Sequence, residues 1–492
     1  MMPIRSALPS LLTLWLLGTA CASDPAPVPP ADTEAPEEAR TFALPDGFDH
    51  ALTQYIEGWG RHWPTFRVHG VTSVARDGEA LQRHAWGLKR LTEGTPHDPT
   101  DAFEIGTLSI HLTHAAVLTK VADGSVDLDA TAADYVPELG LPTAITVEHL
   151  LTMTSGISNF AESLLYERVL KKYPAEPTSL VESFAKDPLE FAPGTDFAPS
   201  LSNTVVLGLI LERVHGTTYA EAVDALVLTP LEMKNTAYGR VDGASVGLSF
   251  HEDEYLVPAL DNDPRALCAA GGWTSTSADL NALYAGLLGD FLPTPLKRRM
   301  LGDNALERPY GFMLRTVAGR DALTWIGRID GHEHGLVMVP RDGVVVLHLA
   351  NSEVAPGPEI AEAVTDLAYD LPAHPREEAR PTPVDIASLA GYAGSWSLTA
   401  SDRDLLMSAT DPETARALFE VTTQFVPGDG LRLHVPGRSV KRMHTTGPLA
   451  FFFKDRPQST ARVVRTTGKP KLVLERGGGS LHYVYAGPPQ SG

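Results

Sequence analysis

The stretch FEIGTLSIHLTHAAVL, residues 103–118, decides how the rest of the chain is interpreted. Its first residues are typical of a strand end or a loop, and the apolar, helix-forming run that follows predicts a buried helix. Thr107 and Ile110 lie three positions apart, so a helix would place their side chains on one face. That face would carry one hydroxyl group and one aliphatic group.

The Phe-x-Ile-Gly frame before Thr107 resembles the nucleophile helix of the serine β-lactamase and penicillin-binding-protein superfamily, especially class C β-lactamase-related proteins and esterases. Those proteins carry Ser-x-x-Lys here, at the positions of Thr107 and Ile110. Other segments resemble the same family: ITVEHLLTMTSG (145–156), FAPGT (191–195) and AGGWTSTSADL (270–280). The resemblance covers residues 45–370 and implies an α/β (α+β) β-lactamase/transpeptidase-like fold, with an antiparallel sheet flanked by helices.

Turn signals place two hairpins in that sheet. Asp77-Gly78 lies between two apolar-rich arms near the start of the domain, and Asp342-Gly343 lies between two more near its end. Asp-Gly between such arms is a strong hairpin signal. In the resembled family the first hairpin opens the sheet, and the second would close it.

The remainder of the chain divides by composition. Residues 371–388 are rich in Pro and Glu and are interpreted as a linker. Residues 389–492 contain short β-rich runs between Gly and Pro turns, which predict a small all-β domain, an antiparallel barrel. Leu389–Trp396 resembles the opening strand of such an added domain.

Acyl transfer in the resembled family needs an activated hydroxyl, a base that takes its proton and a donor for the leaving group. Thr107 keeps a hydroxyl, but its methyl group restricts the rotamer and crowds the path of attack. Ile110 cannot hold or move a proton. The first catalytic element is therefore interpreted as lost.

The second family element, Tyr-x-Asn, is expected shortly after a Pro-Gly pair. Counting without a gap places Pro199 and Leu201 at the Tyr and Asn positions. A shifted alignment reaches Ser202 and Asn203, but Leu201 would then stand where Tyr belongs. Either alignment lacks the phenol.

The third element is a Lys/His-x-Gly strand, represented here by Trp325 and Gly327. Gly327 fits the pattern and would leave room for a substrate along the strand. Replacing a whole polar network by apolar groups is often neutral or stabilising, whereas a partly removed network leaves unpaired groups at about 1–3 kcal/mol each. The apolar set of Ile110, Leu201 and Trp325 therefore indicates a non-catalytic core.

The backbone donors of the family's oxyanion hole do not depend on side chains, and they map to Thr107 and Arg328. With the Arg328 guanidinium nearby, a residual carboxylate-binding site is one hypothesis. A metal site is another, because His332 and His334 share one strand face and His111 and His114 lie three apart. The simpler interpretation is that these histidines are structural, and neither a metal nor another cofactor is expected.

The remaining hydroxyls and the cysteines have simple interpretations. Ser109 and Ser155 lie in the matched segments, but no Lys follows Ser109 three residues later, so both are interpreted as structural. Cys268 is expected to be a buried, inert thiol, because the chain has only one other cysteine, Cys21.

The N-terminal residues are interpreted as an export signal. The apolar segment ends in Leu-Gly-Thr-Ala-Cys, which resembles a bacterial lipoprotein box with Cys21 as the lipidated residue after removal of residues 1–21. The alternative is ordinary cleavage after Ala22 and release of a soluble protein. Residues 22–44, rich in Pro, Ala and acid, are expected to form a disordered tether. The expected location is the bacterial cell envelope or periplasm, with membrane contact only through the lipid.

Composition and net charge limit the classes of binding partner. Apolar residues make up 43% and charged residues 21% of the chain, which is typical of a globular protein. A formal net charge of −21 argues against nucleic acid as a partner. The leading hypothesis is a non-catalytic member that binds cell-wall peptide or an envelope protein, or acts as a scaffold. The alternatives are a divergent esterase or peptidase acting by acyl transfer, and purely structural packing against a partner.

Overall fold

The computed structural model describes residues 42–62, 68–163, 166, 170–250, 255–374, 389, 392–400, 403, 419–426, 430–434, 441–447, 450–453, 456–464, 469–476 and 479–487. The predicted signal, Cys21, most of the tether and most of the linker 371–388 lie outside these residues. Within the described part of the chain, no helix is both long and apolar enough to cross a membrane.

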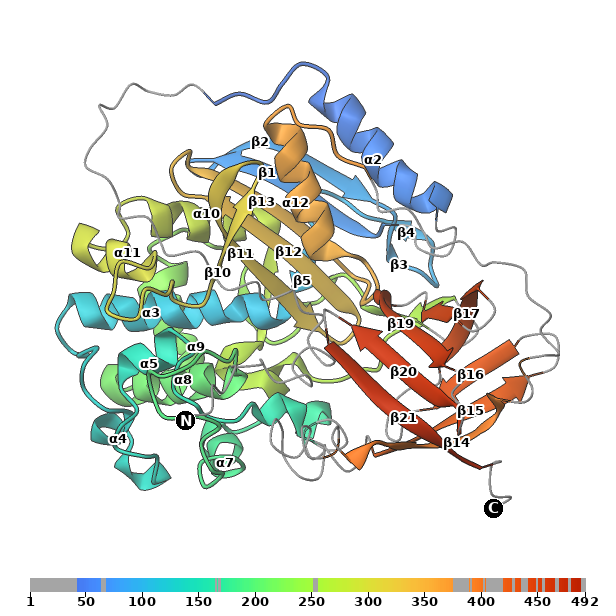
Figure 1. Ribbon diagram of the computed structural model, residues 1–492. Helices are drawn as coiled ribbons and strands as arrows, with labels where there is room; N and C mark the ends of the chain where they lie inside the picture. The colour runs from blue at the N-terminus through green and yellow to red at the C-terminus, as the bar shows by residue number, and fades with distance from the viewer. Residues whose placement is uncertain are drawn as a thin grey trace.

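A six-stranded antiparallel sheet in the order β10-β11-β12-β13-β1-β2 forms the centre of the larger domain (Figure 1). Its N-terminal strand β1 pairs with β13, the last strand of this domain, so the two ends of the domain meet in one sheet. The bounds are β10 (Met313–Val317), β11 (Arg320–Ile329), β12 (His332–Val339), β13 (Val344–Ala350), β1 (Gly70–Arg76) and β2 (Glu79–Trp86).

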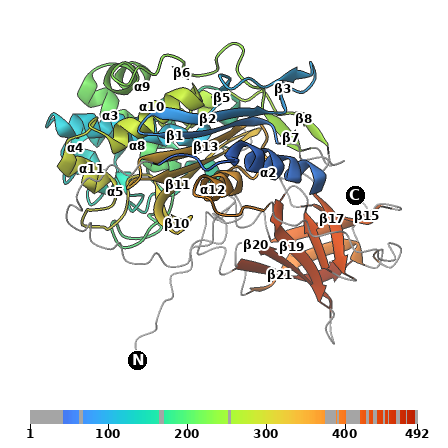
Figure 2. The same ribbon diagram turned by 90° about the horizontal axis from the view of Figure 1, so that it is seen from above.

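Helices cover both faces of this sheet, and for this reason β13, VVVLHLA, is buried along its whole length. On one face, α2 (Phe48–His62) and α12 (Gly357–Ala368) share an apolar cluster with the strand (Figures 1 and 2). On the other face, α3 (Ile110–Ala122), α8 (Leu201–His215) and α10 (Ser277–Leu288) share a larger cluster with it. The predicted fold class is confirmed.

Shorter elements connect these parts. The helices are α4 (Ala132–Tyr135), α5 (Val147–Leu151), α7 (Pro177–Glu182), α9 (Tyr219–Val223) and α11 (Thr294–Met300). The tighter or wider turns are η1 (Gly106–Ser109), η2 (Pro137–Leu139), η3 (Phe160–Glu162), η4 (Leu170–Lys172), η5 (Asp224–Leu228) and η6 (Pro264–Ala270). The strands are β3 (Leu88–Arg90), β4 (Thr95–Pro96), β5 (Ala102–Glu104), β6 (Ala237–Tyr238), β7 (Leu248–Phe250), β8 (Leu256–Pro258) and β9 (Trp273–Thr276).

Both predicted hairpins are present. Asp77 and Gly78 join β1 to β2 with φ angles of 49° and 84°, the positive values that a tight hairpin turn requires. Asp342 and Gly343 join β12 to β13, and the Asp342 N–H donates to the Val339 carbonyl at 3.1 Å. The two Asp-Gly pairs therefore form two hairpins that lie next to each other in the sheet, because β13 pairs with β1.

The C-terminal part forms a closed antiparallel barrel beside the larger domain (Figures 1 and 2). Apolar side chains, among them Trp396, Phe451 and Tyr483, fill its interior. The predicted opening strand 389–396 is shifted, because the first barrel strand covers Gly394–Leu398. The strands are β14 (Gly394–Leu398), β15 (Glu420–Val426), β16 (Gly430–His434), β17 (Lys441–Gly447), β18 (Ala450–Phe453), β19 (Arg456–Val464), β20 (Lys471–Arg476) and β21 (Gly479–Gly487).

The end of the predicted tether is packed against the domain. Phe42 and Leu44 contact the apolar cluster beneath α2 and α12, and the Phe42 ring lies 5.1 Å from the ring of Tyr369. The packed part of the chain therefore reaches at least to Phe42, three residues earlier than the predicted boundary at residue 45.

Candidate functional site

The segment around Thr107 lies directly against strand β11. It is the short 3-10 turn η1, and α3 begins only at Ile110. Gly106 has a φ of +49°, and a Cβ atom there would lie 2.3 Å from the Arg328 carbonyl oxygen. Only glycine allows this approach. The Gly of the Phe-x-Ile-Gly frame therefore lets the turn pack closely against the strand.

The Thr107 hydroxyl is fully engaged by the backbone of β11. It donates to the Ile326 carbonyl at 2.8 Å and accepts from the Arg328 N–H at 3.1 Å. The residue is only 7% exposed. A hydroxyl held from both sides in this way joins the turn to the sheet, and it occupies a backbone donor that the resemblance assigned to the oxyanion hole.

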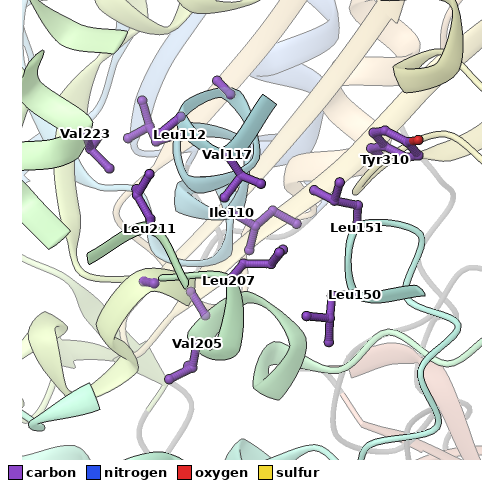
Figure 3. Packing of buried hydrophobic residues seen from close by; sticks show 14 of the residues in the cluster. Ile110, Leu112, Val117, Leu150, Leu151, Val205, Leu207, Leu211, Val223 and Tyr310 are labelled. Carbon is purple, nitrogen blue, oxygen red and sulfur yellow. The ribbon is translucent and has the colours of Figure 1, made fainter. Parts of the chain in front are cut away.

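Ile110 faces a different environment from Thr107. The residue is 0% exposed and belongs to the same apolar cluster as Leu207 of α8, Leu151 and Tyr310, which Figure 3 labels. Thr107 belongs to η1 and Ile110 is the first residue of α3, and the two side chains have different partners. No space remains at position 110 for a charged amine.

Trp325 covers the turn from the sheet side. Its indole N–H donates to the Thr107 carbonyl at 3.1 Å, and the residue is 8% exposed. The Trp325 ring also meets the edge of the His111 ring, with 6.0 Å between the ring centroids. The large side chain of Trp325 thus contacts the backbone of Thr107 at the position where the family would carry a basic group.

Gly327 does not leave room for a ligand in this structure. A Cβ atom there would lie 2.6 Å from Leu108 Cγ and 2.9 Å from His334 Cδ2. The expectation of open space along the strand is therefore wrong, since the missing side chain instead allows η1 and His334 to pack against β11.

His111, four residues after Thr107, occupies an aromatic enclosure that sequence reasoning missed. Its ring stacks on Phe312 at 4.1 Å and contacts the ring of Tyr284 edge-on. Nε2 is 2.8 Å from the Gly311 carbonyl and Nδ1 is 3.0 Å from the Tyr284 hydroxyl. Burial lowers the pKa of His111 to about 3, so this imidazole is neutral and both nitrogens are occupied. The sequence signal noted for His111 was its spacing of three residues from His114, which does not predict the aromatic contacts.

The residues at the Tyr-x-Asn positions are structural. Leu201 is buried at the start of α8. Asn203, the residue reached by the shifted alignment, accepts a hydrogen bond from the Ser155 hydroxyl at 2.5 Å and donates to the Met153 sulfur at 3.3 Å. These contacts tie α8 to the loop after α5. They leave Asn203 and Ser155 no free polar atom for a substrate, and Pro199 has none in its side chain.

Arg328 does not supply a free cation. Its guanidinium pairs with the carboxylate of Glu333, which lies directly opposite on β12. Both side chains are largely withdrawn from water. The hypothesis of a carboxylate site at Arg328 is therefore not supported, because a ligand would have to displace an internal ion pair.

Two of the histidines considered for metal binding, His332 and His334, contact backbone groups. His334 Nε2 lies 2.9 Å from the Glu104 carbonyl, and Nδ1 accepts from the Ala350 N–H at 3.1 Å. His332 Nδ1 faces the Asp330 carbonyl at 3.3 Å. Among the described residues, no three His, Cys, Asp or Glu side chains are arranged to hold a metal ion.

Two remaining side chains are buried. Ser109 is 0% exposed, and Cys268 is a free, buried thiol. Burial raises the pKa of the Cys268 thiol to about 12, which keeps it protonated and inert.

The hydrogen bonds of Thr107 make a testable prediction. Thr107→Val keeps the shape but removes the hydroxyl, leaving the Ile326 carbonyl and the Arg328 N–H without that partner. Each buried unpaired group costs about 1–3 kcal/mol, so we expect the free energy of unfolding to fall by about 2–4 kcal/mol. Urea denaturation would measure this, with Thr107→Ser as the control that keeps the hydroxyl. Equal losses in the two variants would show that the hydroxyl does not join the turn to the strand.

The comparisons with known proteins show which family the chain belongs to. The family profile described as Beta-lactamase matches residues 65–371, more than half of the chain. The protein therefore belongs to the β-lactamase family, which includes penicillin-binding proteins and related serine hydrolases.

Individual relatives show how far the likeness extends. Esterase EstB of Burkholderia gladioli is 32% identical over 203 residues, which are 38% of this chain and 51% of EstB, so the match spans about half of that relative. A penicillin-binding protein of Bacillus subtilis is 22% identical over 77% of this chain and 91% of its own. A D-aminopeptidase of Gluconobacter oxydans is 25% identical over 60% of this chain and 58% of its own.

Solved structures support the fold. An octameric penicillin-binding protein homologue from Pyrococcus abyssi superposes with a TM-score of 0.57 at 18% identity, covering 89% of this chain and 99% of its own. A D-stereospecific amidohydrolase from a Streptomyces species gives a TM-score of 0.54 at 23% identity, covering 62% of this chain and 94% of its own.

Proposed function

We propose that this protein is a catalytically inactive member of the β-lactamase family that acts as a binding or scaffold protein of the bacterial cell envelope. The observation that carries the first part is the Thr107 hydroxyl, which is held by the Ile326 carbonyl and the Arg328 N–H. A nucleophilic hydroxyl needs a base within hydrogen-bond reach to take its proton. The two groups bonded to this oxygen are backbone groups, and neither is a base.

The replacements also fit one another energetically. Ile110 is inside the apolar core, Trp325 donates its only polar hydrogen to the Thr107 carbonyl, and His111 is neutral in an aromatic enclosure. A site that had lost one catalytic group would leave others buried and unpaired, at a cost in stability. The pattern here supports a consistent rebuilding of the region as a packed core.

The envelope part of the proposal rests on the N-terminal sequence. The export signal with Cys21 would place the folded domain outside the cytoplasm, on a tether that ends near Phe42. The partner proposed for this location is a cell-wall peptide or an envelope protein. An acidic chain of net charge −21 is not suited to nucleic acid.

Covalent labelling tests the loss of catalysis. We expect no labelling above background by a fluorescent penicillin or a fluorophosphonate, and no turnover of an activated ester beyond that of the Thr107→Ala variant. Loss of the general base alone reduces rates by about 10²–10⁴-fold, and here the other groups are also replaced. Labelling or turnover that disappears with Thr107→Ala would refute the proposal.

A second candidate is a divergent hydrolase that uses Thr107 for acyl transfer. Two of its relatives are named an esterase and a D-aminopeptidase, and the esterase reaches 32% identity. In this case β11 would have to move away from η1 and release the hydroxyl. The labelling experiment separates the two candidates, because only the hydrolase would form a covalent adduct at Thr107.

A further inference from the structure

Arg308 stands apart from the neighbouring arginines. Arg298 pairs with Asp303 and Arg299 pairs with Glu148, whereas no ion pair joins the Arg308 guanidinium to any residue that the structure describes. Instead, its guanidinium carbon lies 4.5 Å from the centre of the Phe197 ring. The side chain is partly buried. A guanidinium held over an aromatic ring without a carboxylate partner keeps its N–H groups available to an anion.

The loop that carries Arg308 is held in one conformation. The side-chain amide of Asn304 donates to the carbonyls of Arg299 and Arg308 at 2.8 and 2.6 Å. Its oxygen accepts from the N–H groups of Leu306 and Arg308 at 3.0 and 3.3 Å. Glu307 adopts a φ of +50°, a conformation that costs energy for a residue other than glycine. The backbone on both sides of Arg308 is therefore fixed, which orients its side chain before any ligand arrives.

The loop that carries Phe197, residues 194–197, packs against the loop that carries Arg308. A Cβ atom on Gly194 would lie 2.9 Å from His149 Nε2 and 3.8 Å from Leu306 Cδ2, so the two loops meet at α5. The Phe197 N–H donates to the Asp196 carboxylate at 2.7 Å. That carboxylate acts on the charge of Arg308, yet the two residues do not form an ion pair. Burial lowers the pKa of Arg308, and Asp196 only partly opposes the shift.

The stacked pair lies next to the family's catalytic region. Phe197 precedes Pro199 by two residues. Arg308 precedes Gly311 by three, and the carbonyl of Gly311 contacts His111. The loop of Phe197 thus leads to the positions where relatives carry the Tyr-x-Asn element. The loop of Arg308 leads to Gly311, which contacts the helix where relatives carry the nucleophile. A ligand at Arg308 would lie beside the rebuilt region, with no need to enter it.

We propose that Arg308, stacked on Phe197, is a binding site for the carboxylate group of a peptide-like ligand. A guanidinium whose face rests on a ring keeps its N–H groups along the edge, and two parallel N–H donors match the two oxygens of a carboxylate. A single cation suits a monoanion, and the net charge of −21 repels polyanions. The inference rests on the proposed binding role and names the ligand chemistry for it.

The probe for the experiment is N-acetylglycine, titrated into the full chain and followed by calorimetry or chemical shifts. We expect weak, roughly millimolar binding, which is usual for one charged contact with a small ligand. The uncharged N-acetylglycine amide should not bind, and inorganic phosphate should bind more weakly. Arg308→Gln should weaken N-acetylglycine binding at least about tenfold, with Arg308→Lys intermediate because lysine lacks the planar fork. Arg298→Gln, which changes an exposed and paired arginine nearby, should leave binding unchanged.

Several results would overturn the proposal: no N-acetylglycine binding at about 20 mM, equal binding of the amide, or equal binding by Arg308→Gln. The thermal midpoint of each variant shows that it is folded, and Arg308→Met, which keeps the stem on Phe197, replaces Arg308→Gln if that variant unfolds. The result of the binding experiment can be told apart from the result of the labelling test. Turnover through Thr107 would refute the inactive assignment and leave this site standing, whereas failed carboxylate binding would remove this site alone.

Discussion

Replacing Ile110 by lysine is expected to unfold most of the protein at neutral pH, and not to restore the chemistry of Ser-x-x-Lys. Position 110 is completely buried in the apolar cluster that contains Leu207 and Tyr310 (Figure 3). A lysine in such a place loses its proton or disrupts the core, and full burial lowers a lysine pKa by up to about 3–5 units. At roughly 1.4 kcal/mol per unit, this amounts to about 4–7 kcal/mol. Domains of this kind are stable by only about 5–15 kcal/mol.

The measurement is the free energy of unfolding from urea denaturation, with Ile110→Met as the matched control. Methionine has a similar volume and stays apolar, so it should cost less than about 1.5 kcal/mol. The double variant Thr107→Ser/Ile110→Lys should be as unstable as the single lysine variant and should not react with a penicillin. A folded double variant with measurable turnover would show that the core at position 110 can open, contrary to the packing described above.

The protein is also expected to lose stability steeply between pH 6.5 and 5. Among the residues that the structure describes, five buried histidines have a strongly lowered pKa and are neutral. Burial lowers the pKa values of His111, His334 and His348 to about 3, and those of His114 and His332 to about 4. An unfolded chain would protonate each near its ordinary pKa of about 6.5.

The sign follows from proton linkage. Because the folded pKa is depressed, the unfolded state binds more protons below pH 6.5, so stability falls as the pH falls. Each histidine contributes about 1.4 kcal/mol per pH unit, hence roughly 2 kcal/mol at pH 5 and roughly 10 kcal/mol for the five together. Partial desolvation raises the pKa of Glu190 to about 7 and has the opposite sign, but its side chain is exposed, so it offsets less than one histidine.

Thermal or urea midpoints at about pH 7.5, 6 and 5, on both sides of the ordinary histidine pKa, would measure how steeply the stability depends on pH. His114→Leu should reduce the pH dependence by about one proton, because the His114 imidazole makes no hydrogen bond of normal geometry with the described residues and leucine suits the core. His374→Gln, a change at an exposed position, is the control and should not alter the slope. A flat profile from pH 7.5 to 5 would show that the buried imidazoles do not remain neutral.

The residues at the family's motif positions pack against one another and against the sheet. In this protein the hydroxyl of Thr107 bonds to the strand, and the indole of Trp325 caps the turn. The position of the family's lysine has become part of the α3–α8 core. Thr107 and Trp325 therefore have hydrogen-bond partners and Ile110 lies in an apolar cluster, so none of these three side chains leaves a buried polar atom unpaired.

The sequence alone determined the features that depend on local patterns. Asp77-Gly78 and Asp342-Gly343 marked the hairpins because both pairs favour positive φ, and the motif residues around Thr107 identified the fold family. The residues at positions 110, 201 and 325 led to the prediction that the family's motif side chains are replaced there.

Only the tertiary structure decided what the replaced residues do. The partner of the Thr107 hydroxyl is 219 residues away in sequence, on a strand whose distance from η1 depends on Gly106 and Gly327. Likewise, the neutrality of His111 and the contact of Arg308 with Phe197 arise where distant loops and helices pack together. A single sequence records the spacing of residues along one element, whereas these contacts depend on how close different elements come to one another, which is settled by packing of the whole core.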